Sequence, residues 1–338
     1  MTKLSICVPT YNRSTMLLEL LDSIYEQVKG KYEKCVEVAI SDNCSTDDTQ
    51  EKIVEYIEHH KGFAIVYSRN ETNIGPDRNY IQCVKIASGD YAWIMGSDDK
   101  INDDVLEMVL KQLDEGHLLY LSNRENYTFD FHECLGTQYF FKKELNSDIV
   151  IDLGTDQGLD FYFNLCEEVG GVCSYLSSFF FKREMFLEVD DYEPYVGSAY
   201  VHVYNIFKGL LNRERPTIKI LRKPIAKCRL DNDGFFESGF QRIMLDYKGY
   251  IKLAELFTDP LLKKDFMRIV GKHTVPISII LKLGKKERKE LIEVLRLVGH
   301  DEQQIYLIER MSKYKFIAGM LCIDKIINYI KNRIGIKW

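Results

Sequence analysis

The alternation of strand and helix patterns over residues 1–125 constrains the fold of this 338-residue chain more than any other feature. Short apolar runs, typical of buried strands, alternate with segments whose apolar residues recur at helical spacing. The expected strands are residues 4–8, 36–42, 64–67 and 91–95. Helices are expected from a Ser14 or Thr15 cap, after Asp48 and from Asp77. This order predicts an α/β fold with a mostly parallel, Rossmann-like sheet flanked by helices.

The remaining chain has two different patterns. Residues 126–240 are rich in aromatic segments, which we expect to pack mainly in the core. These segments are Tyr139–Phe141, Phe161–Phe163 and Phe179–Phe181. From residue 241 onward Leu, Ile, Lys and Glu dominate and the pattern is helical. The sequence therefore predicts an α/β domain over 1–240, in halves 1–125 and 126–240, followed by a helical C-terminal extension over 241–338.

Charge, cysteine usage and hydropathy exclude several classes. The net charge of -6 is unlike that of a protein that binds a nucleic-acid backbone, so no nucleic-acid partner is expected. The nine cysteines are scattered and odd in number, which favours free thiols in a reducing compartment. The chain opens directly on a strand pattern, and no apolar run reaches the roughly 18 residues of a membrane span. We therefore expect a cytoplasmic protein.

The tail over residues 311–338 differs from the rest in charge. It carries six lysines and arginines against Asp324 alone, hence +5, with apolar and aromatic residues interleaved. Such a segment can lie as a basic amphipathic helix on an anionic membrane surface, here the inner face of the plasma membrane. A terminal helix packed on the domain with a solvated basic face explains the same pattern equally well.

Polar residues follow each strand of the first half. They are Pro9, Thr10, Tyr11 and Asn12 after the first strand, Asp42 and Asn43 at the second, Asn73 after the third, and Ser97, Asp98 and Asp99 after the fourth. In a parallel sheet these ends lie along one edge, where ligands bind. Convergent polar groups in a concave site predict a small polar ligand.

The Asp98-Asp99 pair is the sharpest of these features. Adjacent carboxylates repel each other, and a divalent cation between them and a phosphate relieves that repulsion. Mg²⁺ and Mn²⁺ prefer oxygen ligands and often share them with substrate phosphates. The alternative is that one of the two aspartates only caps the following helix. The three other strand ends at the same edge favour the metal.

The other strand-end residues suggest a nucleotide site. Asp42 and Asn43 carry the acceptors and donors that read a nucleobase edge. Pro9 and Thr10 can shape the turn behind the base, and Tyr11 can lie against the nucleoside. Arg78, in the first turn of the third helix, can pair with a phosphate or with the acidic cluster. A structural pairing of Arg78 with Asp98 or Asp42 is the alternative.

The segments ICVPTYNR, AISDNCSTDDT and NIGPDRNYIQCVKIASGDYAWIMGSDD resemble the inverting glycosyltransferases of family 2, which have the GT-A fold. The resemblance covers about residues 3–110 in the right order and spacing. It differs at Gly96-Ser97-Asp98-Asp99, where the family often has Asp-x-Asp-Asp, so the residue nearest the ribose is in doubt. The Met-Gly-Ser-Asp-Asp form, with the aromatic middle, is similar to the abequosyltransferase-like branch that builds bacterial surface polysaccharide.

The resemblance implies a reaction and its participants. Residues 1–125 would form the nucleotide-sugar half and 126–240 the acceptor half. The donor would be a sugar nucleotide, with UDP the first candidate and CDP, dTDP or GDP as alternatives, and the cofactor Mn²⁺ or Mg²⁺. The acceptor would be a glycan or a polyprenyl-diphosphate-linked glycan. The implied residues are Asp42 for the nucleoside, and Asp98 and Asp99 for metal and diphosphate.

The catalytic base cannot be carried over from the family. The family usually places it in a Glu-Asp pair that begins a helix, and Ser198-Ala199 stand at that point. His202 lies one helical turn further and titrates near neutral pH, so it is a candidate base or metal ligand, with a buried histidine as the alternative. Asp191 and Glu193, just upstream, are the other candidates. Arg229, before a polar loop, suits the diphosphate, although a surface turn is an equal alternative.

Other protein classes fit less well. A nucleotidyltransferase would share the sheet and the metal but have a glycine-rich basic loop after the first strand, where Pro9-Thr10-Tyr11-Asn12 stand. An oxidoreductase would show a Gly-x-Gly-x-x-Gly motif after a strand, and the sequence has none. The missing Glu-Asp pair leaves open a catalytically impaired protein that binds sugar nucleotides without transferring the sugar.

Overall fold

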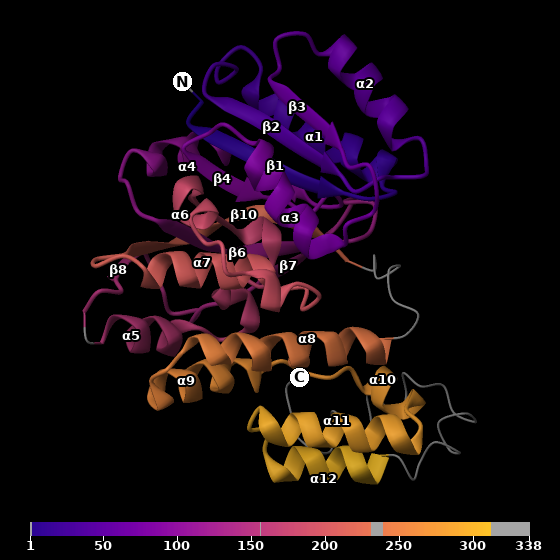
Figure 1. Ribbon diagram of the computed structural model, residues 1–338, viewed down its shortest axis with the longest axis vertical. Coiled ribbons are helices and arrows are strands. Elements are labelled where there is room, and N and C mark those ends of the chain that lie inside the picture. The colour runs from indigo at the N-terminus through magenta and orange to yellow at the C-terminus, as the bar shows by residue number, and fades with distance from the viewer. Residues whose placement is uncertain (1, 156, 231–238, 312–338) are drawn as a thin grey trace. The chain divides into compact units, whose positions relative to one another are not determined.

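The computed structural model describes residues 2–155, 157–230 and 239–311 (Figure 1). The chain divides into two compact units, Met1–Asn232 and Asp233–Trp338. The boundary expected at residue 240 falls at the start of a helix, α8 (Gly239–Leu253). The expected basic tail, apart from Met311, lies outside the described residues, as does Cys322.

One mixed sheet organises the described part of the first unit. Its strand order is β3-β2-β1-β4-β9-β6-β10-β5, with β7 on β6 and β8 on β10. The strands are β1 (Leu4–Thr10), β2 (Val36–Asp42), β3 (Ile65–Arg69), β4 (Tyr91–Ile94), β5 (Lys100–Ile101), β6 (Leu119–Tyr127), β7 (Cys134–Gln138), β8 (Ile149–Asp152), β9 (Phe179–Lys182) and β10 (Thr217–Arg229). β1 pairs in parallel with β2 and β4, and β2 with β3, as the alternation predicts. In the second half only β6 and β10 pair in parallel; the other pairings are antiparallel.

Helices cover this sheet. They are α1 (Ser14–Val28), α2 (Thr49–His59), α3 (Pro76–Ile86), α4 (Leu106–Leu113), α5 (Gly158–Leu165), α6 (Arg183–Leu187) and α7 (Val201–Leu211), with short 3-10 helices η1 (Val169–Val172), η2 (Leu176–Ser178) and η3 (Glu193–Tyr195). The chain moves from β1 outward to β3 and then returns to β4. Right-handed crossovers therefore place α1 and α2 on one face and α3 on the other.

The start of α1 differs from the expectation. The N-cap residue is Arg13, and its side chain makes no capping hydrogen bond. Capping by Ser14 or Thr15 is therefore wrong, because both residues already belong to the helix. The apolar face of α1 holds it in place instead, with Leu17, Leu21 and other residues fully buried against the sheet.

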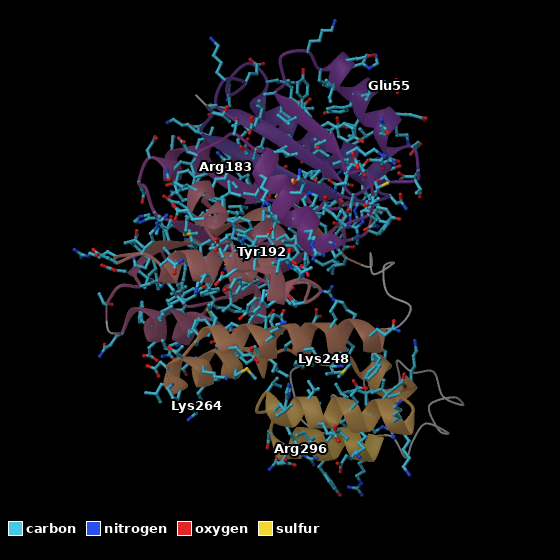
Figure 2. All side chains as sticks on the ribbon, in the orientation of Figure 1. Glu55, Arg183, Tyr192, Lys248, Lys264 and Arg296 are labelled. Carbon is cyan, nitrogen blue, oxygen red and sulfur yellow. The ribbon has the colours of Figure 1, made fainter. Side chains whose placement is uncertain are left out.

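Seven of the nine aromatic rings in the three middle segments pack in the core as expected, and Tyr139 is half-buried. The buried rings are Phe140, Phe141, Tyr162, Phe163, Phe179, Phe180 and Phe181. Phe161, by contrast, is 49% exposed. Polar side chains also join elements of this unit. Arg183 of α6, labelled in Figure 2, donates from Nε to the Gly89 carbonyl at 2.7 Å. This bond fixes α6 to the turn that precedes β4.

The described part of the second unit is helical, as predicted. Its helices are α8 (Gly239–Leu253), η4 (Ala254–Leu256), α9 (Pro260–Val270), α10 (Ile277–Lys282), α11 (Lys285–Leu297) and α12 (Glu302–Met311). Across all described residues, no helix combines the length and apolar character that crossing a membrane requires. The eight cysteines within the described ranges are free thiols, as the sequence predicts.

Candidate active site

The carboxyl ends of β1 and β2 meet because the two strands run in parallel register, with Thr10 opposite Asp42. The loops that follow them are bonded to each other. Asn12 adopts a left-handed conformation with φ of 51°. Its amide N–H donates to Ser45 Oγ at 2.9 Å, and its side-chain Oδ1 accepts from the Thr46 amide at 2.7 Å. The structure thus assigns the predicted nucleotide residue Asn12 a role in holding the first loop against the second.

Asp98 follows β4 at the same edge of the sheet and forms an ion pair with an arginine side chain. Arg13 Nη1 lies 2.6 Å from Asp98 Oδ1, and the two side chains are 16% and 19% exposed. Arg13 belongs to the Tyr11-Asn12-Arg13 motif, yet it was not among the predicted site residues. The ion pair joins the first and fourth strand ends, and Asp98 keeps part of its surface toward solvent.

Asp99 has a different environment from its neighbour. It is 5% exposed, and its Oδ2 accepts hydrogen bonds from Tyr175 Oη at 2.6 Å and from Ser177 Oγ. Its Oδ1 accepts from the Arg229 amide at 3.3 Å. Burial, and then the neighbouring charge of Asp98, raise the pKa of Asp99 to about 7. Tyr175 and Ser177 lie more than seventy residues away in sequence, and no local pattern marked them.

The acidic turn has a donor set that fits a divalent cation. A Cβ added at Gly96 would lie 2.9 Å from Asp99 Oδ2 and 3.0 Å from Asp98 Oδ1, so both carboxylates converge over this glycine. Ser97, which lies between Gly96 and Asp98 in the sequence, is buried. Within the described ranges no group of three or more His, Cys, Asp or Glu side chains could hold a metal alone. Two carboxylates completed by substrate phosphates is the usual arrangement for Mg²⁺.

Arg229 is buried beneath the acidic turn. Its Nε donates to the Asp98 carbonyl at 2.9 Å, Nη2 lies 2.7 Å from Glu19 Oε2, and Nη1 donates to the Phe129 carbonyl. The side chain is 2% exposed. These bonds make Arg229 a support of the turn, and its predicted contact with a diphosphate stays a prediction.

The second and third strand ends form one hydrogen-bonded cluster. Asp42 is fully buried, and its two oxygens accept from the Ser45 amide and from Tyr67 Oη, both at 2.8 Å. Asn43 Nδ2 donates to Asn73 Oδ1 at 2.9 Å. Asp42, Asn43 and Asn73 are thus brought together as the sequence predicts. Their contact with a nucleobase stays a prediction.

The first strand end contains a polar atom without a partner. Thr10 is 3% exposed, and its Oγ1 is buried with no hydrogen-bond partner among the described residues. Pro9 precedes it as a buried strand residue, and Tyr11, which follows, is half-buried. An unpaired buried hydroxyl is costly unless a ligand or water completes it. This feature marks the turn of Pro9, Thr10 and Tyr11 as a place where a polar ligand group would be accommodated.

The first turn of α3 holds the loop that carries two candidate bases. Arg78 Nη2 lies 2.7 Å from Glu193 Oε2, so a predicted phosphate ligand and a predicted base are ion-paired. Pairing of Arg78 with Asp98 or Asp42 is therefore wrong. The neighbouring Asp77 is 2% exposed, and its Oδ2 accepts from the amides of Gly197 at 2.6 Å and Ala199 at 3.1 Å. Asp77, which the sequence analysis missed, thus fixes the turn where the family has its Glu-Asp pair.

The other two candidate bases have different surroundings. Asp191 is exposed and lies 3.6 Å from Lys208 Nζ of α7. His202 is 2% exposed, and its Nε2 lies 3.1 Å from the Cys173 carbonyl. Burial lowers the pKa of His202 to about 3. These features favour the buried-histidine alternative, and a role for His202 as base or metal ligand stays a prediction.

The fold of the described residues belongs to the GT-A class. The chain superimposes on S. aureus TarS 1-349 in complex with UDP-GlcNAc with a TM-score of 0.62 and 20% identity, covering 88% of this chain and 80% of that one. A mannosyltransferase, PcManGT from Pyrobaculum calidifontis in complex with GDP-Man and Mn²⁺, gives 0.55 and 13%, covering 94% and 87%. Both likenesses concern the fold.

Sequence comparison identifies the family. The model of glycosyl transferase family 2 matches residues 5–161. Abequosyltransferase RfbV of Salmonella typhimurium is 33% identical over 329 residues, which cover 95% of this chain and 97% of that protein. The chain therefore belongs to glycosyltransferase family 2, and the predicted GT-A class and enzyme class are confirmed.

Proposed function

We propose that this enzyme transfers a sugar, with inversion, from a nucleoside-diphosphate donor to a glycan or polyprenyl-diphosphate-linked glycan of a bacterial surface polysaccharide. O-antigen or capsule synthesis is the setting that the relationship to abequosyltransferase RfbV supports. The observation that carries the proposal is the junction of the first and fourth strand ends at the Arg13–Asp98 pair, 2.6 Å apart. The bonded second and third strand ends adjoin the first at the same edge.

The donor's nucleoside would lie on the turn of Pro9, Thr10 and Tyr11, beside Asp42 and its neighbours. The unpaired Thr10 Oγ1 supports this position. UDP is the first candidate, because a solved relative in fold holds UDP-GlcNAc. CDP, dTDP and GDP are the alternatives, since Asp42 and Asn43 suit more than one base edge.

Asp98 and Asp99 would hold Mn²⁺ or Mg²⁺ together with the donor's diphosphate. When bound, the cation supplies positive charge that stabilises the departing diphosphate. Asp98 is the more accessible of the two, and Asp99 is held by Tyr175 and Ser177. Arg229 fixes the main chain of this turn and so sets the position of both carboxylates.

Glu193 is the base that the surroundings favour. It is an exposed carboxylate, 2.7 Å from Arg78, on the loop that Asp77 fixes. It would take the proton from the acceptor hydroxyl while the acceptor oxygen bonds to the anomeric carbon. The bond from that carbon to the diphosphate breaks, and its electron pair leaves with the nucleoside diphosphate. Attack opposite to the leaving group inverts the anomeric configuration.

Metal-dependent release of nucleoside diphosphate tests the proposal. UDP, CDP, GDP and dTDP sugars are incubated with the wild-type protein and with Asp98→Asn, with Mn²⁺ or with EDTA. We expect release from at least one donor, lost with EDTA and reduced at least 100-fold in Asp98→Asn. Asp104→Asn, an exposed aspartate just beyond the turn, is the matched control. Release that persists unchanged in Asp98→Asn would contradict the assigned role.

A second candidate is a protein that binds the donor without transferring the sugar. Ser198-Ala199 in place of the Glu-Asp pair favours it. This candidate predicts tight binding of a donor and no release of nucleoside diphosphate from any member of the panel. A nucleotidyltransferase would instead release pyrophosphate from a nucleoside triphosphate, so pyrophosphate assayed in the same reactions separates the third alternative.

We place the enzyme in the cytoplasm, at the inner face of the plasma membrane. The free thiols within the described ranges support a reducing compartment. Residues 311–338, with a net charge of +5, would make the membrane contact through anionic lipids. Flotation with vesicles of anionic and of neutral lipid tests this, and equal binding to anionic vesicles after deletion of 312–338 would overturn it.

A further inference from the structure

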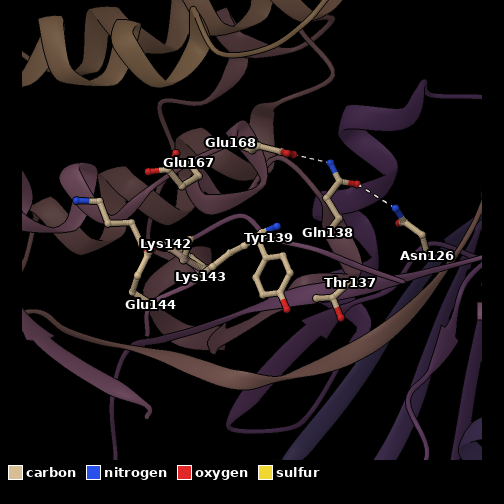
Figure 3. A pocket seen from close by; sticks show the side chains of 10 residues that line it. Asn126, Thr137, Gln138, Tyr139, Lys142, Lys143, Glu144, Glu167 and Glu168 are labelled. Carbon is tan, nitrogen blue, oxygen red and sulfur yellow. Dashed lines mark hydrogen bonds between the residues drawn. The ribbon is translucent and has the colours of Figure 1, made fainter. Parts of the chain in front are cut away.

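A cavity of about 750 Å³ opens in the first unit beside β7 (Figure 3). We call it the β7 pocket, and the residues that matter for its chemistry are Asn126, Gln138, Tyr139, Lys143, Glu167 and Glu168. None of them belongs to the candidate donor site. Its volume is in the range of small-molecule sites, roughly 300–1,000 Å³.

Backbone hydrogen bonds frame the β7 pocket. The amides of Glu167 and Glu168 donate to the Phe140 carbonyl at 2.8 and 3.3 Å. The Lys142 amide donates to the Leu165 carbonyl at 3.0 Å. These bonds join the segment after β7 to the segment after α5. The carboxylates therefore stand on a fixed main chain, and the pocket is preformed.

The lining suits a polar ligand without strong charge. Two lysines and three glutamates line the pocket, which gives 2 − 3 = −1. Amides from Gln138 and Asn126 and the Tyr139 ring complete it, and Asn126 Oδ1 is buried without a partner among the described residues. Carboxylate and amide oxygens accept from hydroxyl groups, and an aromatic ring packs on a sugar's apolar face. A net negative lining disfavours a phosphate polymer.

A short chain of contacts links the β7 pocket to the acidic turn. In the pocket wall Glu168, Gln138 and Asn126 are bonded in a row (Figure 3). Gln138 Oε1 also accepts from Arg124 Nε and Nη2 at 3.1 and 2.7 Å. The Arg124 guanidinium lies 4.1 Å from the centre of the Tyr175 ring, whose hydroxyl donates to Asp99. Only two side chains stand between the pocket wall and Asp99.

We propose that the β7 pocket binds the acceptor of the transfer, as a neutral saccharide unit whose hydroxyl groups meet the glutamates and amides. This inference rests on the proposed function. A neutral acceptor would distinguish the enzyme from the TarS proteins, which share its fold and are named for the anionic polymer poly(ribitol-phosphate).

Saturation-transfer NMR on the full chain tests the pocket directly. The probes are the methyl α-glycosides of mannose, galactose and rhamnose, with glycerol phosphate as the anionic probe. We expect a saturation-transfer signal from at least one glycoside, and we expect this signal to be at least fivefold weaker in Tyr139→Ala and in Glu167→Gln. Glu133→Gln, an exposed carboxylate on the β6–β7 loop, should match the wild type. Glu167→Gln preserves side-chain size and keeps the test valid if Tyr139→Ala does not fold.

Three outcomes would overturn the pocket proposal. The first is that no glycoside receives saturation from the protein. The second is that both pocket variants keep the wild-type NMR signal. The third is that glycerol phosphate alone receives saturation. The wild-type protein's release of nucleoside diphosphate is measured separately. If that release is absent while glycosides bind and the variants lose them, the proposed function fails and the saccharide site stands. If release occurs and the glycosides do not bind, only the pocket proposal fails.

Discussion

His202 should make the protein less stable in acid, because its ring is held neutral in the core. The Phe179 ring stacks on the imidazole, and the Tyr80 ring meets it edge-on. Nε2–H donates to the Cys173 carbonyl at 3.1 Å, and Nδ1 is buried without a partner among the described residues. Burial lowers the pKa of His202 to about 3, well below the value of about 6.5 in an unfolded chain.

The sign and size of the effect follow from proton uptake. Below pH 6.5 the unfolded chain protonates this histidine and the folded chain does not, so the free energy of unfolding falls as the pH falls toward 3. Each pH unit in this window costs about 1.4 kcal/mol. Between pH 7.5 and pH 5.0 His202 should therefore remove about 2 kcal/mol of stability. His202→Phe should abolish this contribution, since phenylalanine does not titrate and suits aromatic neighbours.

Urea unfolding at pH 7.5 and 5.0, followed by tryptophan fluorescence, measures the difference. The buried Trp93 reports on the first unit. His132→Phe, at a histidine side chain that is 86% exposed, is the matched control and should keep the wild-type pH dependence. A His202→Phe protein with that same dependence would refute the argument. Turnover should stay within about twofold of wild type, because the His202 ring is buried with Nε2 on the Cys173 carbonyl. A loss above tenfold in a stable protein would support the predicted role of His202 in the site.

Three other changes test the supports of the site. Arg229→Ala should lower the free energy of unfolding, measured with urea, by about 2–3 kcal/mol. This is less than the loss of a fully buried ion pair would cost, because the partner Glu19 is 37% exposed. The control Arg222→Ala, at an exposed position of the same strand, should cost under about 0.5 kcal/mol. Asp77→Ala should cost about 2 kcal/mol in the same assay, since the amides of Gly197 and Ala199 lose their shared acceptor, and an unchanged midpoint would contradict the assigned role of Asp77 in fixing this turn. Glu193→Gln should lower sugar transfer at least 100-fold while donor affinity by calorimetry stays within twofold; full transfer activity would eliminate Glu193 as the base.

Local patterns in the sequence were sufficient for the four parallel strands of the first half of the fold. Apolar runs bounded by polar turns located β1, β2, β3 and β4, and parallel order then placed their ends at one edge. The family resemblance rested on motifs at those same ends, and the comparisons confirm it. The mixed pairing of the second half could not be anticipated. There β9 inserts between β4 and β6, and its partners lie far away in sequence.

Contacts between distant residues decided what the sequence left open at the site. Asp99 is buried because Ser177 of η2 and Tyr175, the residue before η2, both donate hydrogen bonds to it. Arg229, at the end of β10, donates to the same carboxylate from its main-chain amide. Arg78 meets Glu193 across more than a hundred residues. The hydrophobic periodicity of a sequence does not indicate contacts between residues so far apart in the chain. The roles of these residues in binding and catalysis stay predictions, to be decided by the variants above.

The packing around Gly96 suits the replacement of the family's first aspartate by glycine at the acidic turn. Where the family often has a first aspartate, this chain has Gly96, and a Cβ there would come within 3.0 Å of an oxygen of each following carboxylate. A third acidic side chain would need both to move and would add a third negative charge to a partly buried turn. Arg13 balances Asp98, and neutral donors surround Asp99. The turn therefore places its two carboxylates in unequal surroundings: Asp98 pairs with Arg13, and Asp99 is held by Tyr175 and Ser177.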